Sequence, residues 1–293
     1  MGEGHIRENS MENLWNVWFT ELHRKCVGLS IKVKHCIYSG ESPYQRIDVL
    51  DTYEFGRMLV LYGSIMLTER DEFIYHEMIS HVPLFVHLSP EKVLIVGGGD
   101  GGSLREILRH KRVKEVHLVE VDKMVIEISK RYFPTISTGF NDPRVCVFIE
   151  DGLTFLKKTK NSYDVIIVDS PDPIGPGERL FQKEFHRLVY KALKEDGVFV
   201  GQSESPFFHQ RTIKLMYKNL RDIFPLVAMY MAYIPTYPSG LWSFAFCSKR
   251  YHPINDFDEN RVRATNIYTN YYNPDVHRAS FALPNFVEQL LKT

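Results

Sequence analysis

Acidic side chains follow four short apolar stretches of this sequence. They are Asp100, Glu120, Asp151 and the pair Asp169 and Asp172. The carboxyl ends of parallel strands meet at one edge of a sheet, so we expect these carboxylates to lie close together. Crowded carboxylates raise each other's pKa unless cations bind between them. The next basic residue after Asp100 is Arg105, on an expected helix, so the cations are expected to come from the ligands.

The last acidic turn lies in the stretch VIIVDSPDPIGPGE, which runs from Val165 to Glu178. Pro171 and Pro173 lack backbone donors and fix their own φ angles, which would hold the two aspartates on a stiff turn. A purely structural turn is the alternative interpretation. The other acidic strand ends favour a binding site.

A glycine-rich turn follows the stretch 92–96. Gly97, Gly99 and Gly102 satisfy G-x-G-x-x-G between an expected strand and helix, and Glu120 ends the next strand about 20 residues on, where a carboxylate binds ribose hydroxyls. Asp100 sits inside this turn and would repel a diphosphate. The pattern therefore predicts a nucleoside with a positive or neutral tail, such as a sulfonium nucleoside, rather than NAD. A tight turn without a ligand is the alternative.

Asp151 and Gly152 follow the third stretch. The carboxylate can accept a hydrogen bond from an adenine amine, and Gly152 would admit the ring. Asp151 can equally cap a helix that starts near Thr154. Both interpretations can hold together.

Composition excludes several functional classes. The chain has 293 residues with 36 basic and 36 acidic side chains, which gives no electrostatic basis for binding nucleic acid or an anionic membrane. No apolar run is long enough to span a membrane. Four scattered cysteines without a C-x-x-C spacing indicate reduced thiols and a cytoplasmic protein. Residues 1–13 are polar and are expected to form a flexible leader.

The pattern of expected secondary structure changes near residue 70. Short β-like runs at 29–38, 46–51, 58–62 and 64–68 predict a small antiparallel β-domain over residues 14–70. From 71 to 293, strands and helices alternate, which predicts a doubly wound α/β sheet. Strands are expected at 92–96, 115–121, 145–149, 164–169, 197–202, 228–234 and 242–248. Helices are expected at 72–86, 103–110, 123–132, 154–158, 181–193 and 209–223. Functional side chains should follow Val96, Val119, Ile149, Val168 and Gly201.

Several segments jointly resemble the aminopropyltransferases, most closely the spermidine synthases. They are LTERDEFIYHEM (67–78), GGGDGGSLREIL (97–108), VEVD (119–122), EDG (150–152), DSPDPIGP (169–176), IPTYPSGLW (234–242) and YYNPDVHRASFALPNF (271–286). The resemblance covers roughly residues 14 to 290. It implies a small N-terminal β-domain followed by a Rossmann-like sheet of the class I methyltransferase type.

The resemblance also implies an activity. Such an enzyme moves the aminopropyl group of decarboxylated S-adenosylmethionine to putrescine, giving spermidine and methylthioadenosine. It implies no metal and no cofactor, since the nucleoside is a co-substrate, and it implies a homodimer or homotetramer. Agmatine, cadaverine or a longer polyamine remain alternative acceptors. A methyltransferase acting on a small amine and an inactive nucleoside-binding protein are further alternatives.

Matching motif positions assigns roles to individual residues. The implied donor-binding residues are Gln45, Gly97, Asp100, Glu120, Asp151, Gly152, Asp169 and Pro176. The implied acceptor-binding residues are Tyr75, His76, Asp172, Gln202, Tyr237 and Trp18. Residues 173–180 match a loop that closes over the site. The chain departs from the family pattern at His76, Met66 and Pro171, and the first two bear on the acceptor.

The chemistry gives these roles a physical basis. A primary amine arrives protonated near neutral pH, so a carboxylate must accept its proton before it attacks the carbon beside the sulfonium. Asp169 is assigned this task, Tyr75 positions the nitrogen, and Asp172 anchors the acceptor. Asp100 would repel the α-carboxylate of ordinary S-adenosylmethionine and so favour the decarboxylated donor.

Overall fold

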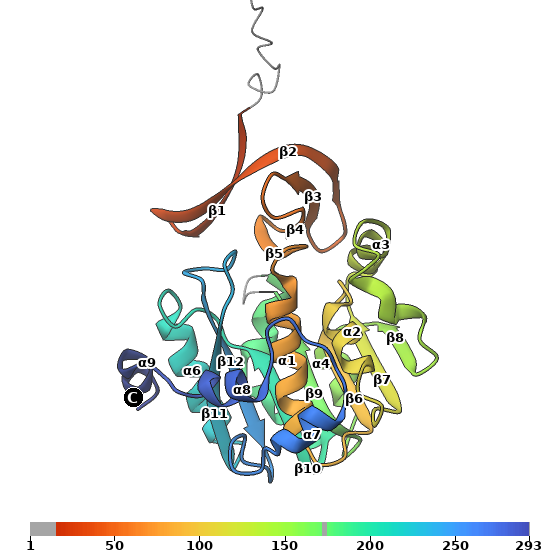
Figure 1. Ribbon diagram of the computed structural model, residues 1–293, viewed down its shortest axis with the longest axis vertical. Helices are drawn as coiled ribbons and strands as arrows, with labels where there is room; N and C mark the ends of the chain where they lie inside the picture. Colours follow the sequence, from red (N-terminus) through yellow and green to blue (C-terminus); the bar gives the residue numbers. More distant parts are fainter. Residues whose placement is uncertain (1–15, 172–174, 293) are drawn as a thin grey trace, which may run out of the picture.

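A computed structural model describes residues 16–171 and 175–292 as two sheets with helices around the larger one (Figure 1). The leader, Asp172, Pro173 and the side chain of Pro176 lie outside the described part. Within that part, no helix combines the length and the apolar character needed to cross a bilayer.

The smaller sheet is antiparallel and its strands follow chain order. They are β1 (Val17–Arg24), β2 (Val27–Glu41), β3 (Arg46–Thr52), β4 (Arg57–Leu61) and β5 (Ser64–Thr68). The four expected strands are present. Strand β1 is not predicted from the sequence, because Val17, Trp18, Phe19 and Leu22 put apolar side chains on both of its faces and hide the alternation of a half-buried strand.

The larger sheet has the strand order β11-β12-β10-β9-β6-β7-β8. Its strands are β6 (Lys92–Gly97), β7 (Glu115–Glu120), β8 (Val145–Ile149), β9 (Tyr163–Asp169), β10 (Leu193–Gln202), β11 (Leu226–Tyr233) and β12 (Leu241–Ser248). The five strands from β8 to β10 pair in parallel, and β12 and β11 pair antiparallel at the far side. The predicted doubly wound α/β fold of the methyltransferase type is confirmed.

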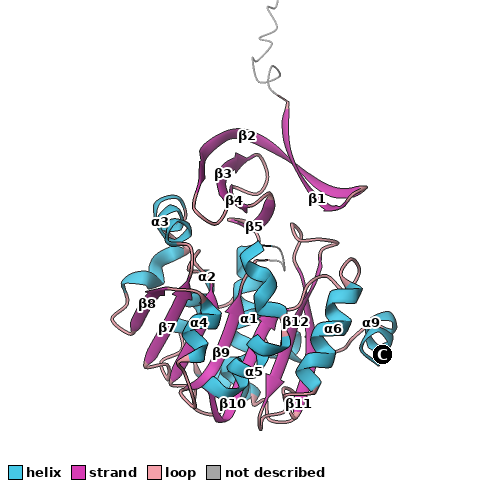
Figure 2. Cartoon of the chain, turned by 180° about the vertical axis from the view of Figure 1, so that it is seen from behind, coloured by secondary structure: helices cyan, strands magenta, loops and turns pink. Residues whose placement is uncertain are grey.

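Helices cover both faces of this sheet (Figure 2). They are α1 (Glu72–Val86), α2 (Gly102–Leu108), α3 (Lys123–Tyr132), α4 (Gly152–Lys157), α5 (Lys183–Ala192), α6 (Gln210–Arg221), α7 (Glu259–Ala264), α8 (Pro274–Ser280) and α9 (Asn285–Lys292). One apolar core joins the sheet to α1 and α2, and a second joins it to α4, α5 and α6. The expected helix 181–193 is shorter, because the short helix η3 (Gly175–Phe181) precedes α5 and Leu193 already belongs to β10.

The smaller sheet lies at the carboxyl ends of the parallel strands (Figure 1). Apolar side chains of β3, β4 and β5 pack on α3 and on the segment that follows it, which contains the short helix η2 (Ser137–Asn141). The edge of the sheet where ligands bind in such folds is therefore roofed by the N-terminal strands.

Candidate active site

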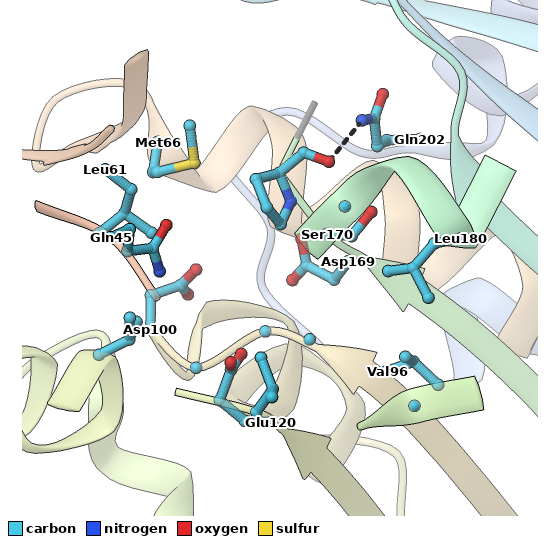
Figure 3. A pocket seen from close by; sticks show the side chains of 18 of the residues that line it. Gln45, Leu61, Met66, Val96, Asp100, Glu120, Asp169, Ser170, Leu180 and Gln202 are labelled. Carbon is cyan, nitrogen blue, oxygen red and sulfur yellow. Dashed lines mark hydrogen bonds between the residues drawn. The ribbon is translucent and has the colours of Figure 1, made fainter. Parts of the chain in front are cut away.

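One cavity of about 510 Å³ lies between the roof and the strand ends. Figure 3 shows side chains from both sheets around it. The segments after β6, β7, β8, β9 and the end of β10 all line it, as the sequence predicts. They contribute Gly97, Gly98, Gly99, Asp100, Glu120, Glu150, Asp151, Gly152, Asp169, Ser170, Pro171 and Gln202.

The ends of β6 and β9 are fastened together at the centre of the cavity. Gly98 N–H donates to the Asp169 carbonyl at 2.7 Å. Gly97 has a φ of +85°, and a Cβ there would lie 2.0 Å from the same carbonyl oxygen. Only glycine fits such an approach, so the first glycine of the motif brings the glycine-rich turn against Asp169.

Asp169 is a buried carboxylate held by two hydroxyls. Ser103 Oγ donates to its Oδ2 at 2.6 Å, and the Tyr75 hydroxyl also donates to it. Burial and the nearby charge of Asp100 raise the pKa of Asp169 to about 6. Above that pH the group is an anion that can accept a proton, as general-base catalysis requires.

Asp100 lies opposite, inside the glycine turn. Its Oδ1 accepts from Gly102 N–H at 2.7 Å and lies 3.3 Å from His76 Nε2. Burial opposes ionisation of Asp100, but the charge and hydrogen bond of His76, the Gly102 N–H and the charge of Arg105 together outweigh it and lower the pKa of Asp100. The carboxylate is therefore ionised and already has a cationic neighbour.

The charge of His76 corrects the expectation that the cations between these carboxylates come from the ligands. Burial disfavours a charged His76, yet Asp100 and Glu72 raise its pKa well above the usual value. His76 Nδ1 lies 2.5 Å from Glu72, which also accepts two hydrogen bonds from Arg105 at 2.9 Å each. Helix α1 brings this charge alongside the turn from 24 positions earlier in the chain, a contact that sequence spacing does not reveal. His76, assigned to the acceptor, thus contacts a residue assigned to the donor.

Glu120 ends β7 beside the glycine turn. Burial, together with the charges of Asp122 and Asp100, raises the pKa of Glu120 to about 7. Its Oε1 accepts from Asp122 N–H at 2.8 Å. Gln45 from the smaller sheet reaches the same corner and donates to Asp122 at 3.1 Å. The structure therefore brings Gln45, Asp100 and Glu120 together, as Figure 3 shows.

Asp151 serves as a helix cap. Its Oδ1 accepts from the backbone N–H and the hydroxyl of Thr154, each at 2.8 Å, at the start of α4. The capping interpretation is confirmed, and the contact with adenine stays a prediction. Asp151 and Gly152 both line the cavity, so the two roles are compatible.

The residues assigned to the acceptor occupy different places. Tyr75 and Tyr237 are in ring contact at 5.7 Å, and Tyr237 donates to the Met66 carbonyl at 2.6 Å. Gln202 donates to the Pro171 carbonyl at 3.5 Å, the dashed line in Figure 3. Trp18 is 52% exposed on β1 and is not among the cavity-lining residues. The assignments of Asp172 and Pro176 lie outside the described residues and side chains.

The site contains polar residues that were not predicted from the sequence, among them Glu21 and Ser103. Glu21 from β1 lines the cavity and accepts from Ile65 N–H at 2.7 Å. Burial raises the pKa of Glu21 to about 7. Neither residue stands at a strand end of the larger sheet. Glu21 stands inside β1, a strand that is not predicted from the sequence, so no pattern marked it as a site residue.

Two groups of side chains in the described ranges could hold a metal ion. The ligand atoms of His76, Asp100 and Asp169 lie within 4.8 Å of one another in the cavity, and those of His87, Asp164 and Asp196 do so elsewhere. A metal needs a neutral imidazole, whereas Glu72 and Asp100 favour the imidazolium of His76.

Comparisons with known proteins agree with this geometry. Residues 72–259 match the model of the spermine/spermidine synthase domain, and residues 17–69 match that of the spermidine synthase tetramerisation domain. A polyamine aminopropyltransferase of Caldicellulosiruptor bescii is 50% identical over 276 residues, which is 94% of this chain and 98% of the relative. One of Alkaliphilus oremlandii is 48% identical with the same coverage.

Solved structures show the same likeness. A spermidine synthase in complex with the transition-state analogue AdoDATO is 48% identical, with a TM-score of 0.93 over 94% of this chain and 95% of the other. The spermidine synthase from Thermotoga maritima has a TM-score of 0.91 at 48% identity, over 94% of each chain. Both sheets of the present chain fall within these likenesses.

Proposed function

Since this chain belongs to the spermine/spermidine synthase family and is an aminopropyltransferase, we propose that it moves the aminopropyl group of decarboxylated S-adenosylmethionine to putrescine. The products are spermidine and methylthioadenosine. The observation that carries this proposal is Asp169, a carboxylate with a pKa near 6 that lies beside both the nucleoside turn and Tyr75.

Asp169 acts on the acceptor. It accepts a proton from the primary ammonium, and the freed nitrogen lone pair attacks the methylene carbon next to the sulfonium. The carbon–nitrogen bond forms as the carbon–sulfur bond breaks, and its electron pair stays on sulfur as the thioether of methylthioadenosine. The Tyr75 hydroxyl remains protonated, because burial and then Asp169 raise its pKa well above the usual value, so Tyr75 positions the nitrogen and transfers no proton.

Holding the two substrates together supplies much of the acceleration. Aligning two reactants in one site is worth roughly 7–11 kcal/mol over free encounter. Glu120 would hold the ribose and Asp151 the adenine amine. Asp100 would hold the aminopropyl ammonium and repel the α-carboxylate of ordinary S-adenosylmethionine.

A path of contacts favours a diamine as the acceptor. Tyr75 lies beside Asp169, its ring contacts Tyr237, and Tyr237 binds the carbonyl of Met66. Ile65 precedes Met66, and its N–H donates to Glu21, a further carboxylate that lines the cavity. An acceptor with a cation at each end would meet an anion at each end of this path, and Asp172 would add a further anchor.

We infer that no metal or cofactor takes part, because the sulfonium is already an activated leaving group. We also infer a homodimer or homotetramer, because β1 and β2 expose the apolar side chains of Val17, Trp18, Leu22 and Val27. We further infer a cytoplasmic location, because the four cysteines are free.

The test combines amine specificity with one variant. Putrescine, cadaverine, agmatine and spermidine are each incubated with the decarboxylated donor, and products are identified by mass. We expect putrescine to react fastest, and Asp169→Asn to lower the turnover number by about 10²–10⁴-fold. The matched control is Asp222→Asn, which changes an exposed carboxylate paired with Lys183 outside the cavity and should retain full turnover. Absence of methylthioadenosine release with every amine would refute the proposal.

A further inference from the structure

The imidazole of His76 is clamped between two carboxylates in the wall of the cavity. Its Nδ1 lies 2.5 Å from Glu72 Oε2 and its Nε2 lies 3.3 Å from Asp100 Oδ1. The side chain is buried, and a Cβ on Gly102 would lie only 2.2 Å from the ring. The third glycine of the motif therefore makes room for His76.

Glu72 fixes which nitrogen keeps its proton. Arg105 donates to both oxygens of Glu72 at 2.9 Å and also binds Glu106 at 2.8 Å, so the carboxylate is fixed as an anion behind Nδ1. An anion at Nδ1 favours the tautomer that carries hydrogen there. The exchangeable proton of the imidazolium is then the one on Nε2, which faces the cavity.

The ammonium of the donor must occupy the same corner. The ligand atoms of His76, Asp100 and Asp169 lie within 4.8 Å of one another, and Nε2 of His76 lies 3.3 Å from Asp100, so a cation held by the two aspartates would lie beside the ring. Two like charges at that distance disfavour each other. Glu72 and Tyr75 on its own helix, Asp100, Asp169 and, through Glu72, Arg105 are the titratable or charged groups around the ring.

We propose that the aminopropyl ammonium of the donor displaces the Nε2 proton of His76 and donates a hydrogen bond to the freed nitrogen, so that donor binding releases one proton. The displaced proton passes to solvent. Neutral His76 thereby becomes a ligand of the donor, and Asp100 exchanges its imidazolium partner for the substrate. This inference rests on the proposed function.

Calorimetry in buffers of different ionisation enthalpy measures the released proton. Decarboxylated S-adenosylmethionine is compared with methylthioadenosine, which shares the adenosine and lacks the aminopropyl ammonium. At about pH 8 Asp169 and Glu120, with pKa values of about 6 and about 7, are mostly ionised and contribute little. We expect the donor to release close to one proton more than methylthioadenosine, and its affinity to rise nearly tenfold per pH unit below the pKa of free His76.

Two variants assign the proton. His76→Gln should abolish the difference between the two nucleosides. His117→Gln is the matched control, since His117 binds Glu115 and Tyr163 outside the cavity, and it should release as much as the unaltered protein. Equal release with both nucleosides in the unaltered protein, or a difference that persists in His76→Gln, would overturn the inference while leaving aminopropyl transfer intact. Failure of both nucleosides to bind would refute the proposed function itself.

Discussion

Asp169 meets three hydrogen-bond donors at the end of β9, two at its side chain and one at its carbonyl. The Ser103 and Tyr75 hydroxyls stabilise the charged form of the carboxyl group, whereas burial and Asp100 destabilise it. The balance leaves a pKa of about 6, slightly below neutral. A base so tuned is ionised at neutral pH and still basic enough to accept a proton.

Removing Ser103 tests this balance. In Ser103→Ala the carboxylate loses a donor that favours its charged form, so its pKa should rise. With the donor saturating, so that the proton of His76 does not contribute, the acid limb of kcat/KM for putrescine should move upward by about one to two units, since hydrogen bonds to charged groups are worth roughly 1.5–3 kcal/mol. Initial rates across pH measure it. An acid limb that stays in place would show that Asp169 is not the titrating base.

At the scale of elements, the strand ends of the larger sheet carry the candidate site residues, whereas the hairpin of β1 and β2 carries exposed apolar side chains. Strands β1 and β2 extend beyond the rest of the molecule (Figure 1). Leu22 near their turn is 67% exposed and shares the hairpin with the exposed Val17, Trp18 and Val27. Several exposed apolar side chains on one hairpin are typical of an interaction surface. The hairpin is thus the surface we assign to assembly.

A charge on the hairpin should dissociate the assembly. Leu22→Asp places a carboxylate in the apolar surface and should shift the molar mass toward the monomer, as measured by light scattering after size-exclusion chromatography. Leu215→Asp is the control, because Leu215 is similarly exposed but belongs to α6 and not to the hairpin. A monomeric unaltered protein, or a dissociating control, would contradict the assignment.

Elements with a clear period were predictable from sequence, and contacts between distant segments were not. The range 123–132 matches α3 because its apolar residues repeat with a helical period and it is too long for an ordinary strand. The C-terminal helices α7, α8 and α9 are six to eight residues long, too short for a periodic signal. The gathering of carboxylates at one edge of the larger sheet was predictable from the parallel strands alone. The contact of His76 with Asp100 was not, because it depends on how α1 packs against α2.

At the scale of the whole molecule, both sheets line one cavity, and the buried Glu21 in that cavity makes the free energy of unfolding depend on pH. Glu21 has a pKa of about 7 in the folded protein against 4.5 when free. The folded state therefore binds its proton more tightly than the unfolded state. This contribution to stability is fully present below about pH 4.5 and is lost as the pH rises through about 7.

Glu21→Gln removes this dependence. At about pH 8 we expect the variant to have a free energy of unfolding about 1–3 kcal/mol higher than the unaltered protein, and no difference below about pH 4.5. Denaturant titrations at the two pH values measure it, with the exposed Glu288→Gln on α9 as the control. A Glu21→Gln variant that is less stable than the unaltered protein at about pH 8 would contradict an uncompensated charge at Glu21. Because Glu21 is proposed to meet one end of the acceptor, the KM for putrescine should also rise in Glu21→Gln.

The roof over the strand ends has a consequence for how this protein can be divided. Glu21 and Gln45 enter the cavity from a sheet that precedes every residue of the nucleoside turn. A fragment holding only the larger sheet would keep Asp100, Glu120 and Asp169 but open them to water. The smallest working unit is therefore both sheets together, and a graft of this chemistry onto another nucleoside-binding scaffold would have to carry the roof with it.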